Sequence, residues 1–463
     1  MKFRTESDTM GTIQIPAEMF YGASTQRAVN NFPVSGMRFP RRFIEALALI
    51  KGAAAVANAE LGTLDSKLAK AIAAKSLEVA QGKYDTHFPV DIFQTGSGTS
   101  TNMNANEVIA NLANVALGGK MGTKSPVHPN DHVNMGQSSN DVIPTAIHVA
   151  AALGISESLL PVLKKLEASL NKKAKAFSET VKIGRTHLQD ATPITMGQEF
   201  SGYAAQLSNN ITRLQMALDG LKDLAIGGTA VGTGINTHPK FAFLVCKHLS
   251  QKTGIDFREA QNHFEAQAAK DAAVFASGAL KTLAVSLMKI ANDLRWLASG
   301  PRCGIGEILL PELQPGSSIM PGKINPVIPE MICQIAAQVI GNDAAITIAG
   351  ASGNFELNVM MPVLAANLLE SIEILANGAK LFDEKCVSGI SVNDKRAKEL
   401  VEQSLAMVTA LVPVIGYDKA AALAKKAHAQ GKTIRELLKS EKILSDSEIK
   451  KHLDPKSMLK PRV

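Results

Sequence analysis

The sequence predicts a mainly α-helical protein organised around a central bundle of long helices. Apolar residues recur three and four positions apart in several segments, which is the pattern of helices that bury one face. Residues 262–298 form a run of about 37 residues without a proline, enough for a helix roughly 55 Å long. Strands and helices do not alternate along the chain, which argues against a nucleotide-binding parallel sheet.

Other segments show the same helical periodicity: residues 41–61, 157–177, 211–221, 329–349 and 359–381. The last two carry too few charges for a face in water, so we expect them to bury against other subunits. After about Asp394 the chain becomes richer in charge and predicts a small separate helical domain.

The composition favours a soluble protein of two or three domains, since 463 residues contain 46% hydrophobic and only 5% aromatic residues. The formal net charge is +7, but Lys and Arg are scattered, which argues against nucleic-acid binding. A net positive field still attracts small dianions.

Residues 1–20 lack the apolar run of a secretory signal, and no stretch reaches about 18 consecutive apolar residues. We therefore expect a cytoplasmic protein without a membrane span. Cys246, Cys303, Cys333 and Cys386 are far apart and show no C-x-x-C spacing. This spacing argues against a zinc site or an iron–sulfur cluster, so we expect no metal and no cofactor.

Segments rich in Gly, Asn and hydroxyl residues interrupt the helices at residues 95–106, 127–140 and 183–198. Residues 95–104 lead into one helical run, and residues 137–141 precede an apolar helix that starts near Val142. A helix N-terminus offers unpaired N–H groups and partial positive charge, so hydroxyls and amides there can hold a carboxylate. Ordinary helix capping is the alternative for either segment.

A loop at residues 316–326 combines two glycines and two prolines with two hydroxyls, one ammonium and one amide. It can close over an anion, or it can be an ordinary linker. The glycines of residues 227–234 superficially resemble a phosphate loop, but a plain turn is the better interpretation. His187 lies between polar neighbours and can act as a general acid or orient a water. His128 and His132 are four apart, although Pro129 and Asn130 favour a turn over a metal-binding helix.

Six sequence blocks resemble, in order, those of the fumarase/aspartase superfamily, and within it the class II fumarases, over essentially the whole chain. They read TGSGTSTNMNANEV, HPNDHVNMGQSSNDVIPTAIH, GRTHLQDATP, TAVGTGINTHP, LASGPRCGIGE and GSSIMPGKINP. Met135-Gly136 departs from the usual fumarase pattern, and Val327-Ile328-Pro329 is more similar to the ammonia-lyases.

The resemblance implies a three-domain fumarase/aspartase-like fold, with mostly helical domains at residues 1–137, 138–393 and 394–463. It also implies a homotetramer with a twenty-helix core, in which three subunits contribute to each active site.

The implied activity is reversible hydration of fumarate to L-malate, a step of the citric acid cycle, by anti addition and elimination through an aci-carboxylate. The substrate is a small dicarboxylate, with no nucleic-acid or membrane partner. An aspartate ammonia-lyase and a catalytically silent structural relative are the alternatives. The intact Ser317, His187, Lys323 and Asn325 argue against the silent relative.

In the family the base is Ser317, while His187 handles the water with Glu330 as its carboxylate partner; an assignment of the base to His187 stays open. The expected substrate-binding residues are Ser97, Thr99, Ser138, Ser139, Asn140, Thr186, Lys323 and Asn325. The residues that match a second, non-catalytic dicarboxylate site are His128, Pro129, Asn130 and Asp131.

Overall fold

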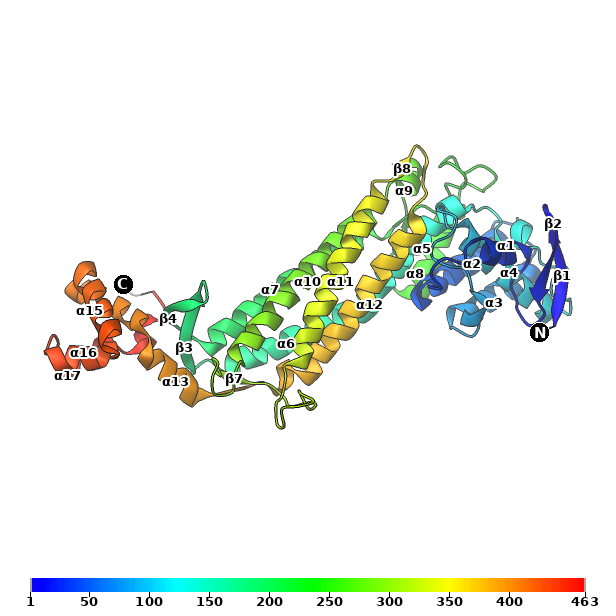
Figure 1. Ribbon diagram of the computed structural model, residues 1–463. Coiled ribbons are helices and arrows are strands. Elements are labelled where there is room, and N and C mark those ends of the chain that lie inside the picture. The colour runs from blue at the N-terminus through cyan, green and yellow to red at the C-terminus, as the bar shows by residue number, and fades with distance from the viewer. Residues whose placement is uncertain (1, 462–463) are drawn as a thin grey trace. The chain divides into compact units, whose positions relative to one another are not determined.

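The computed structural model describes residues 2–461, and these residues are mostly helical, as predicted (Figure 1). The chain divides into two compact units. The first comprises Met1–Pro161, Ile211–Ala284 and Ile335–Ala376, and the second comprises Val162–Asn210, Val285–Gln334 and Asn377–Val463. The division into three domains remains a prediction.

The first unit begins with a hairpin of β1 (Phe3–Asp8) and β2 (Gly11–Pro16). Its helices are α1 (Ala23–Asn31), α2 (Arg41–Glu60), α3 (Ser66–Ala80), α4 (Thr99–Ala116), α5 (Ser139–Leu153), α8 (Phe241–Thr253) and α9 (His263–Ala268). The short strands β5 (Asp223–Leu224) and β6 (Arg258–Glu259) pair in parallel, and β8 (Gly353–Asn354) pairs with β9 (Leu357–Asn358). Helix α2 is central because Phe43, Leu47, Ile50 and Ala54 are all buried.

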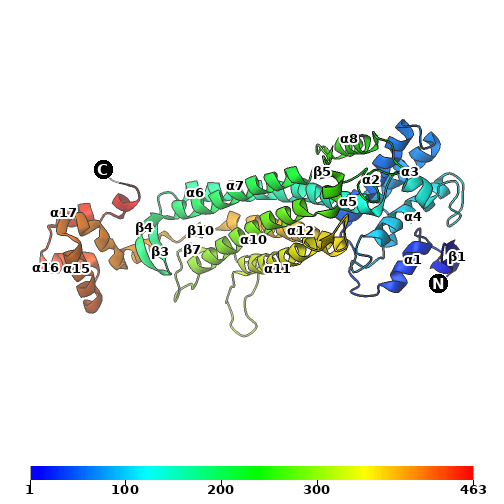
Figure 2. The same cartoon turned by 90° about the horizontal axis from the view of Figure 1, so that it is seen from above.

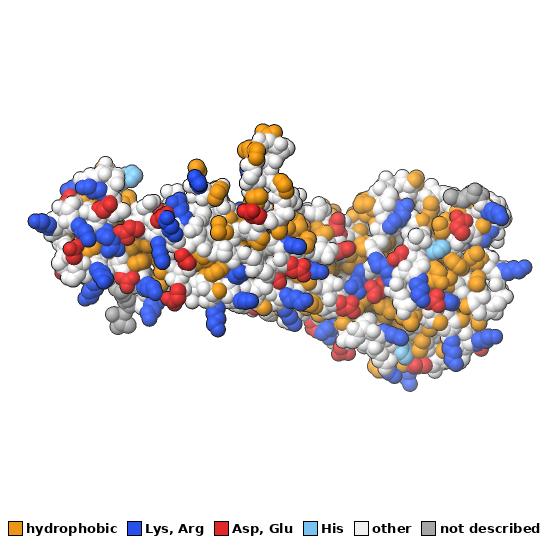
Figure 3. All heavy atoms as spheres, turned by 90° about the horizontal axis from the view of Figure 1, so that it is seen from below, with side chains coloured by type: hydrophobic (Ala, Val, Ile, Leu, Met, Phe, Trp, Pro, Cys, Tyr) orange, Lys and Arg blue, Asp and Glu red, His pale blue; other side chains and the backbone are white. Residues whose placement is uncertain are grey.

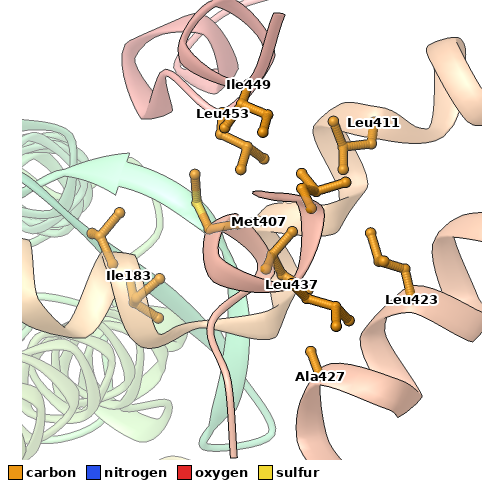
Figure 4. Packing of buried hydrophobic residues seen from close by; sticks show 11 residues of the cluster. Ile183, Met407, Leu411, Leu423, Ala427, Leu437, Ile449 and Leu453 are labelled. Atoms are coloured by element: carbon orange, nitrogen blue, oxygen red, sulfur yellow. The ribbon is translucent and has the colours of Figure 1, made fainter. Parts of the chain in front are cut away.

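The second unit contains most of α6 (Leu160–Ala176) and a hairpin of β3 (Val181–Thr186) and β4 (Gln189–Thr195). The strands β7 (Ile308–Leu309) and β10 (Ser391–Val392) also pair here. Its C-terminal helices are α13 (Asp394–Gln403), α14 (Val412–Ile415), α15 (Tyr417–Gln430), α16 (Ile434–Glu441) and α17 (Asp446–His452). Figure 4 shows the apolar cluster that contains Leu423, Leu437 and Ile449 of these helices and Ile183 of β3. The hairpin base is therefore packed into the C-terminal core.

Four long helices contribute residues to both units: α7 (Met196–Gly220), α10 (Asp271–Leu297), α11 (Val327–Gly350) and α12 (Met361–Lys385). They lie side by side as a bundle in both views of the ribbon (Figures 1 and 2). Ser277 of α10 donates to Asp343 Oδ1 of α11 at 2.7 Å, and Asn342 of α11 donates to Ser371 Oγ of α12 at 3.1 Å. Buried polar contacts thus link α10 to α11 and α11 to α12.

The expected single helix over residues 262–298 is wrong, because it breaks into α9 and α10. Ala269 has an extended backbone, with φ of −77° and ψ of 156°. The ammonium of Lys270 is buried at the break and donates to the carbonyls of Gln267 and Ala269 at 2.6 and 2.7 Å. These two carbonyls accept from the Lys270 ammonium, so α9 ends before Lys270. The remaining helix, Asp271–Leu297, is about 40 Å long at 1.5 Å per residue.

Three helical stretches are long and apolar enough to cross a membrane by length and composition alone: Ser139–Ala176, Asp271–Leu297 and Val327–Gly350. The most apolar window of Val327–Gly350 is only 33% buried within the described chain. Much of the apolar surface of this helix is therefore not covered by the rest of the described chain, as is typical of an interaction surface. On the face in Figure 3, Lys and Arg are scattered among acidic and neutral side chains, as the sequence suggested.

Candidate active site

A close approach of two backbones shapes the loop before α4. Gly98 forms the N-cap with a φ of 73°, a left-handed conformation that suits glycine. Gly96 lies against the segment that leads into α12, and Met361 donates its N–H to Gly96 O at 3.1 Å. A Cβ at Gly96 would be 1.8 Å from Val359 O, so only glycine fits. This contact holds the start of α4 against the start of α12.

A row of hydroxyls joins the N-terminal ends of α4 and α5. Ser97 Oγ lies 2.8 Å from Thr99 Oγ1, which lies 2.7 Å from Ser139 Oγ. Thr99 and Ser139 are the first residues of their helices, so two helix N-termini with partial positive charge converge here. The structure therefore brings three predicted binding residues together where an anion is favoured.

Ser138 and Asp141 form the capping box of α5. The Asp141 carboxylate is buried and accepts from Ser138 N at 2.9 Å and from Gly227 N and Thr229 N at 3.0 Å each. Burial raises the pKa of Asp141 to about 6. Beside it, Asn140 Nδ2 donates to Ala230 O at 2.8 Å. The glycine-rich turn thus binds a carboxylate of the chain itself, which confirms the choice of a turn over a phosphate loop.

A buried lysine that the sequence analysis missed supports this end of α5. Lys51 of α2 is 0% exposed, and its Nζ donates to Asn134 Oδ1 and Gln137 Oε1 at 2.9 Å each. Asn102 and Asn106 of α4 donate to the same Asn134 oxygen at 3.2 and 3.1 Å. Burial lowers the pKa of Lys51 to about 7, against the opposing effect of the Asp141 charge. The available signal was its position, next to Ile50 and four residues after Leu47 on an apolar face.

The predicted second dicarboxylate segment folds as a single wide turn over Pro129–Val133. His128 Nδ1 accepts from Asn130 N and Asp131 N at 3.2 Å each, and His132 Nδ1 accepts from His128 N at 2.8 Å. Both δ nitrogens are therefore occupied by backbone donors. Within residues 2–461, no group of three His, Cys, Asp or Glu side chains has the arrangement of a metal site.

In the second unit, Ser317 lies in a loop that aims two backbone donors at its hydroxyl. Ser317 Oγ accepts from Ile319 N at 3.2 Å and from Met320 N at 2.9 Å. The loop closes at its base, since Gly316 N donates to Lys323 O at 2.7 Å and Asn325 Nδ2 donates to Gly316 O at 2.6 Å. N–H groups directed at an oxygen stabilise negative charge on it. The Lys323 side chain is exposed.

A cavity of about 670 Å³ lies between this loop and the C-terminal end of α10. Its lining includes Lys323, Asn325 and Glu330, together with Arg295 and Trp296 of α10. Glu330 is in the first turn of α11. Three predicted site residues therefore face one hollow within the second unit.

His187 is presented at the tip of the β3–β4 hairpin. His187 and Leu188 form its two-residue turn, and both have a φ of 58°. Such turns ordinarily use Asn-Gly, because residues with bulky side chains are strained there. Thr186 and His187 are exposed. Among the described residues, no hydrogen bond or ion pair joins His187 to Glu330 or Ser317.

Comparisons with known proteins place the chain in a family. The family model for lyases matches residues 11–341, and the model for the fumarase C C-terminus matches residues 407–460. The class II fumarate hydratase of Nitrosomonas europaea is 56% identical over 435 residues, 94% of each chain. This chain belongs to the class II fumarase family.

Other class II fumarases agree over nearly the full length. The fumarate hydratase of Methylorubrum extorquens is 53% identical over 458 residues, which are 99% of this chain and 97% of the relative. The crystal structure of the Schistosoma mansoni class II fumarase superposes with a TM-score of 0.97 at 40% identity, covering 100% of both chains. A cobalt-bound fumarate lyase:delta crystallin of Brucella melitensis gives a TM-score of 0.95 at 45% identity, covering 99% of this chain and 100% of that one.

Proposed function

We propose that this chain is an enzyme that catalyses the reversible hydration of fumarate to L-malate, without a metal or cofactor, in the cytoplasmic citric acid cycle. Near-full-length identity to class II fumarate hydratases supports the reaction. The single observation that carries the mechanism is the pair of backbone N–H groups aimed at Ser317 Oγ. An unassisted serine is too weak a base for a C–H bond, and these donors favour its ionised form.

In the direction of elimination, ionised Ser317 takes the C3 proton of malate, and the electron pair of that bond moves into the adjacent carboxylate as the aci-form. The pair then returns to form the C2–C3 double bond while the C2–O bond breaks. His187 gives a proton to the departing hydroxyl, so that water leaves. Glu330 is the proposed carboxylate partner of His187.

The two carboxylates of the substrate need two differently built sites. Ser97, Thr99, Ser138, Ser139 and Asn140, together with the converging helix N-termini, would bind and orient the substrate without a full positive charge. Lys323 and Asn325 would hold the carboxylate that accumulates charge, and Thr186 would add a hydroxyl.

We propose a homotetramer in which these groups come from three subunits. The weakly covered apolar surface of Val327–Gly350 supports such an assembly, because an exposed apolar helix of this length needs a partner. The proposal that three subunits contribute to each active site rests on the family resemblance. His128, Pro129, Asn130 and Asp131 are proposed as a separate dicarboxylate site outside the catalytic step.

The test is conversion of L-malate to fumarate, followed by the ultraviolet absorbance of the double bond, with L-aspartate as the parallel substrate. We expect turnover of malate, no turnover of aspartate, and full activity after treatment with a chelator. Turnover of aspartate alone would make the chain an ammonia-lyase, and turnover of neither would make it a structural relative. Loss with chelator and recovery with iron would overturn the metal-free mechanism.

A further inference from the structure

The hairpin that carries His187 stands on a group of buried charges in the second unit. Glu307 is 0% exposed, and its Oε2 accepts from Arg185 Nη1 at 2.7 Å. Lys182 is 1% exposed, and its Nζ lies 3.9 Å from the same oxygen. Lys182 also donates to Glu199 Oε2 at 3.1 Å. Two cations of β3 therefore meet one buried carboxylate.

A β-bulge explains how these two cations reach the same side of the strand. Residues three apart in a regular strand point to opposite faces. The register of β3 with β4 shifts between Ile183 and Arg185, with Gly184 at the shift. A Cβ on Gly184 would lie 2.6 Å from Thr192 O, so the bulge requires glycine. Bulges beside functional sites redirect side chains, and this one turns Arg185 toward Glu307.

The tip of the hairpin needs such an anchor. His187 and Leu188 both hold the left-handed conformation, which persists only where the surroundings enforce it. Within the described chain, no side-chain hydrogen bond is made by residues 186–189, although the backbone ladder pairs Thr186 with Gln189. Arg185, next to the tip, is therefore the nearest residue whose side chain anchors the hairpin, through its hydrogen bond to Glu307.

Arg185 and Lys182 are the cations that lie beside the buried Glu307 carboxylate. Its second oxygen, Oε1, is buried and has no hydrogen-bond partner among residues 2–461. A buried carboxylate without compensation is strongly unfavourable, so Arg185 and Lys182 are held where they are. The backbone of Glu307 is itself fixed, since its N–H donates to Leu297 O and its carbonyl accepts from Asn393 N at 2.9 Å each.

We propose that Glu307 is a positioning residue, which acts through Arg185 and Lys182 to fix the hairpin that presents His187 to the departing water. The inference rests on the proposed function, in which His187 serves the C–O step and Ser317 the C–H step. It predicts that a substitution of Glu307 slows the C–O step and leaves the C–H step nearly unchanged.

The experiment compares wild type with Glu307→Gln, which keeps the shape and removes the charge. Exchange of the C3 proton of malate with deuterated solvent is followed by NMR beside net fumarate formation. We expect net elimination to fall by about 10²-fold, as for a small misplacement of a catalytic group, while exchange falls less than about 3-fold. Arg185→Gln should give the same loss, and the double variant should lose no more, since both act through one contact.

Tyr203→Phe is the matched control. Tyr203 Oη contacts Glu199 Oε1 at 3.1 Å and Asp293 Oδ2 at 3.0 Å, so it belongs to the same buried network without touching the hairpin. It should lower thermal stability and leave the ratio of exchange to elimination at the wild-type value. Glu307→Asp keeps the charge but shortens the side chain, so it should raise the ratio of exchange to elimination by a smaller factor than Glu307→Gln does. This variant tests the inference if Glu307→Gln does not fold.

A wild-type ratio in Glu307→Gln or Glu307→Asp would overturn the inference, as would an equal rise of the ratio in Tyr203→Phe. An inactive wild-type enzyme would instead overturn the proposed function. The two failures are therefore distinguishable.

Discussion

The hydroxyl cluster at the starts of α4 and α5 and the Ser317 loop are built in opposite ways. In the cluster, the proposed binding residue Ser138 is also the N-cap of α5, and buried Lys51 and Asp141 support this end of the helix. In the loop, Lys323 is exposed, and the hydrogen bonds of Ser317 Oγ and Asn325 Nδ2 stay within the loop itself. A substitution in the cluster should therefore cost both stability and binding, whereas one in the loop should cost activity alone.

Ser317→Ala should have the largest effect and should fall on activity alone. Loss of a general base typically costs about 10²–10⁴ in rate, so turnover should fall by at least that factor. Because the removed hydroxyl supports no core packing, the melting temperature and the oligomeric state should be unchanged. The measurements are malate turnover and thermal unfolding, with His187→Asn in parallel. His187→Asn should lose less and still exchange the C3 proton; the reverse result would make His187 the base.

Asp141→Asn should show the opposite behaviour of the cluster. The amide can place only one oxygen where three backbone N–H groups now converge, so at least one buried donor loses its partner. We expect a loss of about 2–3 kcal/mol of stability together with a raised KM for malate. Chemical denaturation and steady-state kinetics measure the two effects. A raised KM with unchanged stability would contradict the view that substitutions in the cluster affect stability and binding together.

Lys51→Met tests the buried cation through pH. The pKa of Lys51 is about 7 in the folded chain and near 10.5 when unfolded, so between these values the unfolded chain binds more protons. The stability of wild type relative to Lys51→Met should therefore rise with pH across this window, by at most about 1.4 kcal/mol per pH unit, and should be flat below it. Unfolding of both proteins from pH 6 to 10 measures the slope. A slope of the opposite sign would place a charged, stabilising ammonium at this position.

Ser138→Ala is the mildest test of the cluster. Loss of an N-cap side chain costs about 1 kcal/mol, and the cap of α5 should follow this value. Ser445→Ala, which removes an equivalent capping box from α17 in the second unit, is the control. Both should lower stability similarly, but only Ser138→Ala should raise KM. Equal KM values in the two variants would show that Ser138 caps α5 but does not bind the substrate.

Sequence patterns predicted those parts of the molecule that depend on near neighbours. The cap at Ser138, the turn at residues 227–234 and the long apolar helices all follow from local spacing, and the structure has them. Lys51 was missed because its partners, Asn134 and Gln137, are 83 and 86 residues away.

Two further features were invisible for other reasons. The break at Lys270 contains neither proline nor glycine, so nothing in the local sequence marks it. The left-handed tip at His187 defies the usual preference for Asn-Gly and is imposed by the hairpin and its buried base. The grouping of Ser317, His187 and Glu330 in one site remains a proposal, supported by family resemblance.

Gly96 also bears on attempts to redesign this enzyme for other dicarboxylates. It lies one residue before Ser97, where a mutagenesis library aimed at the substrate would naturally be centred. Every side chain at Gly96 meets the carbonyl of Val359 and pushes the start of α12 away from α4. Most members of a library randomised at this codon would be lost to misassembly before selection for a new specificity began. Diversity is better placed at Ser97 and Thr99, whose side chains can change without separating two backbones.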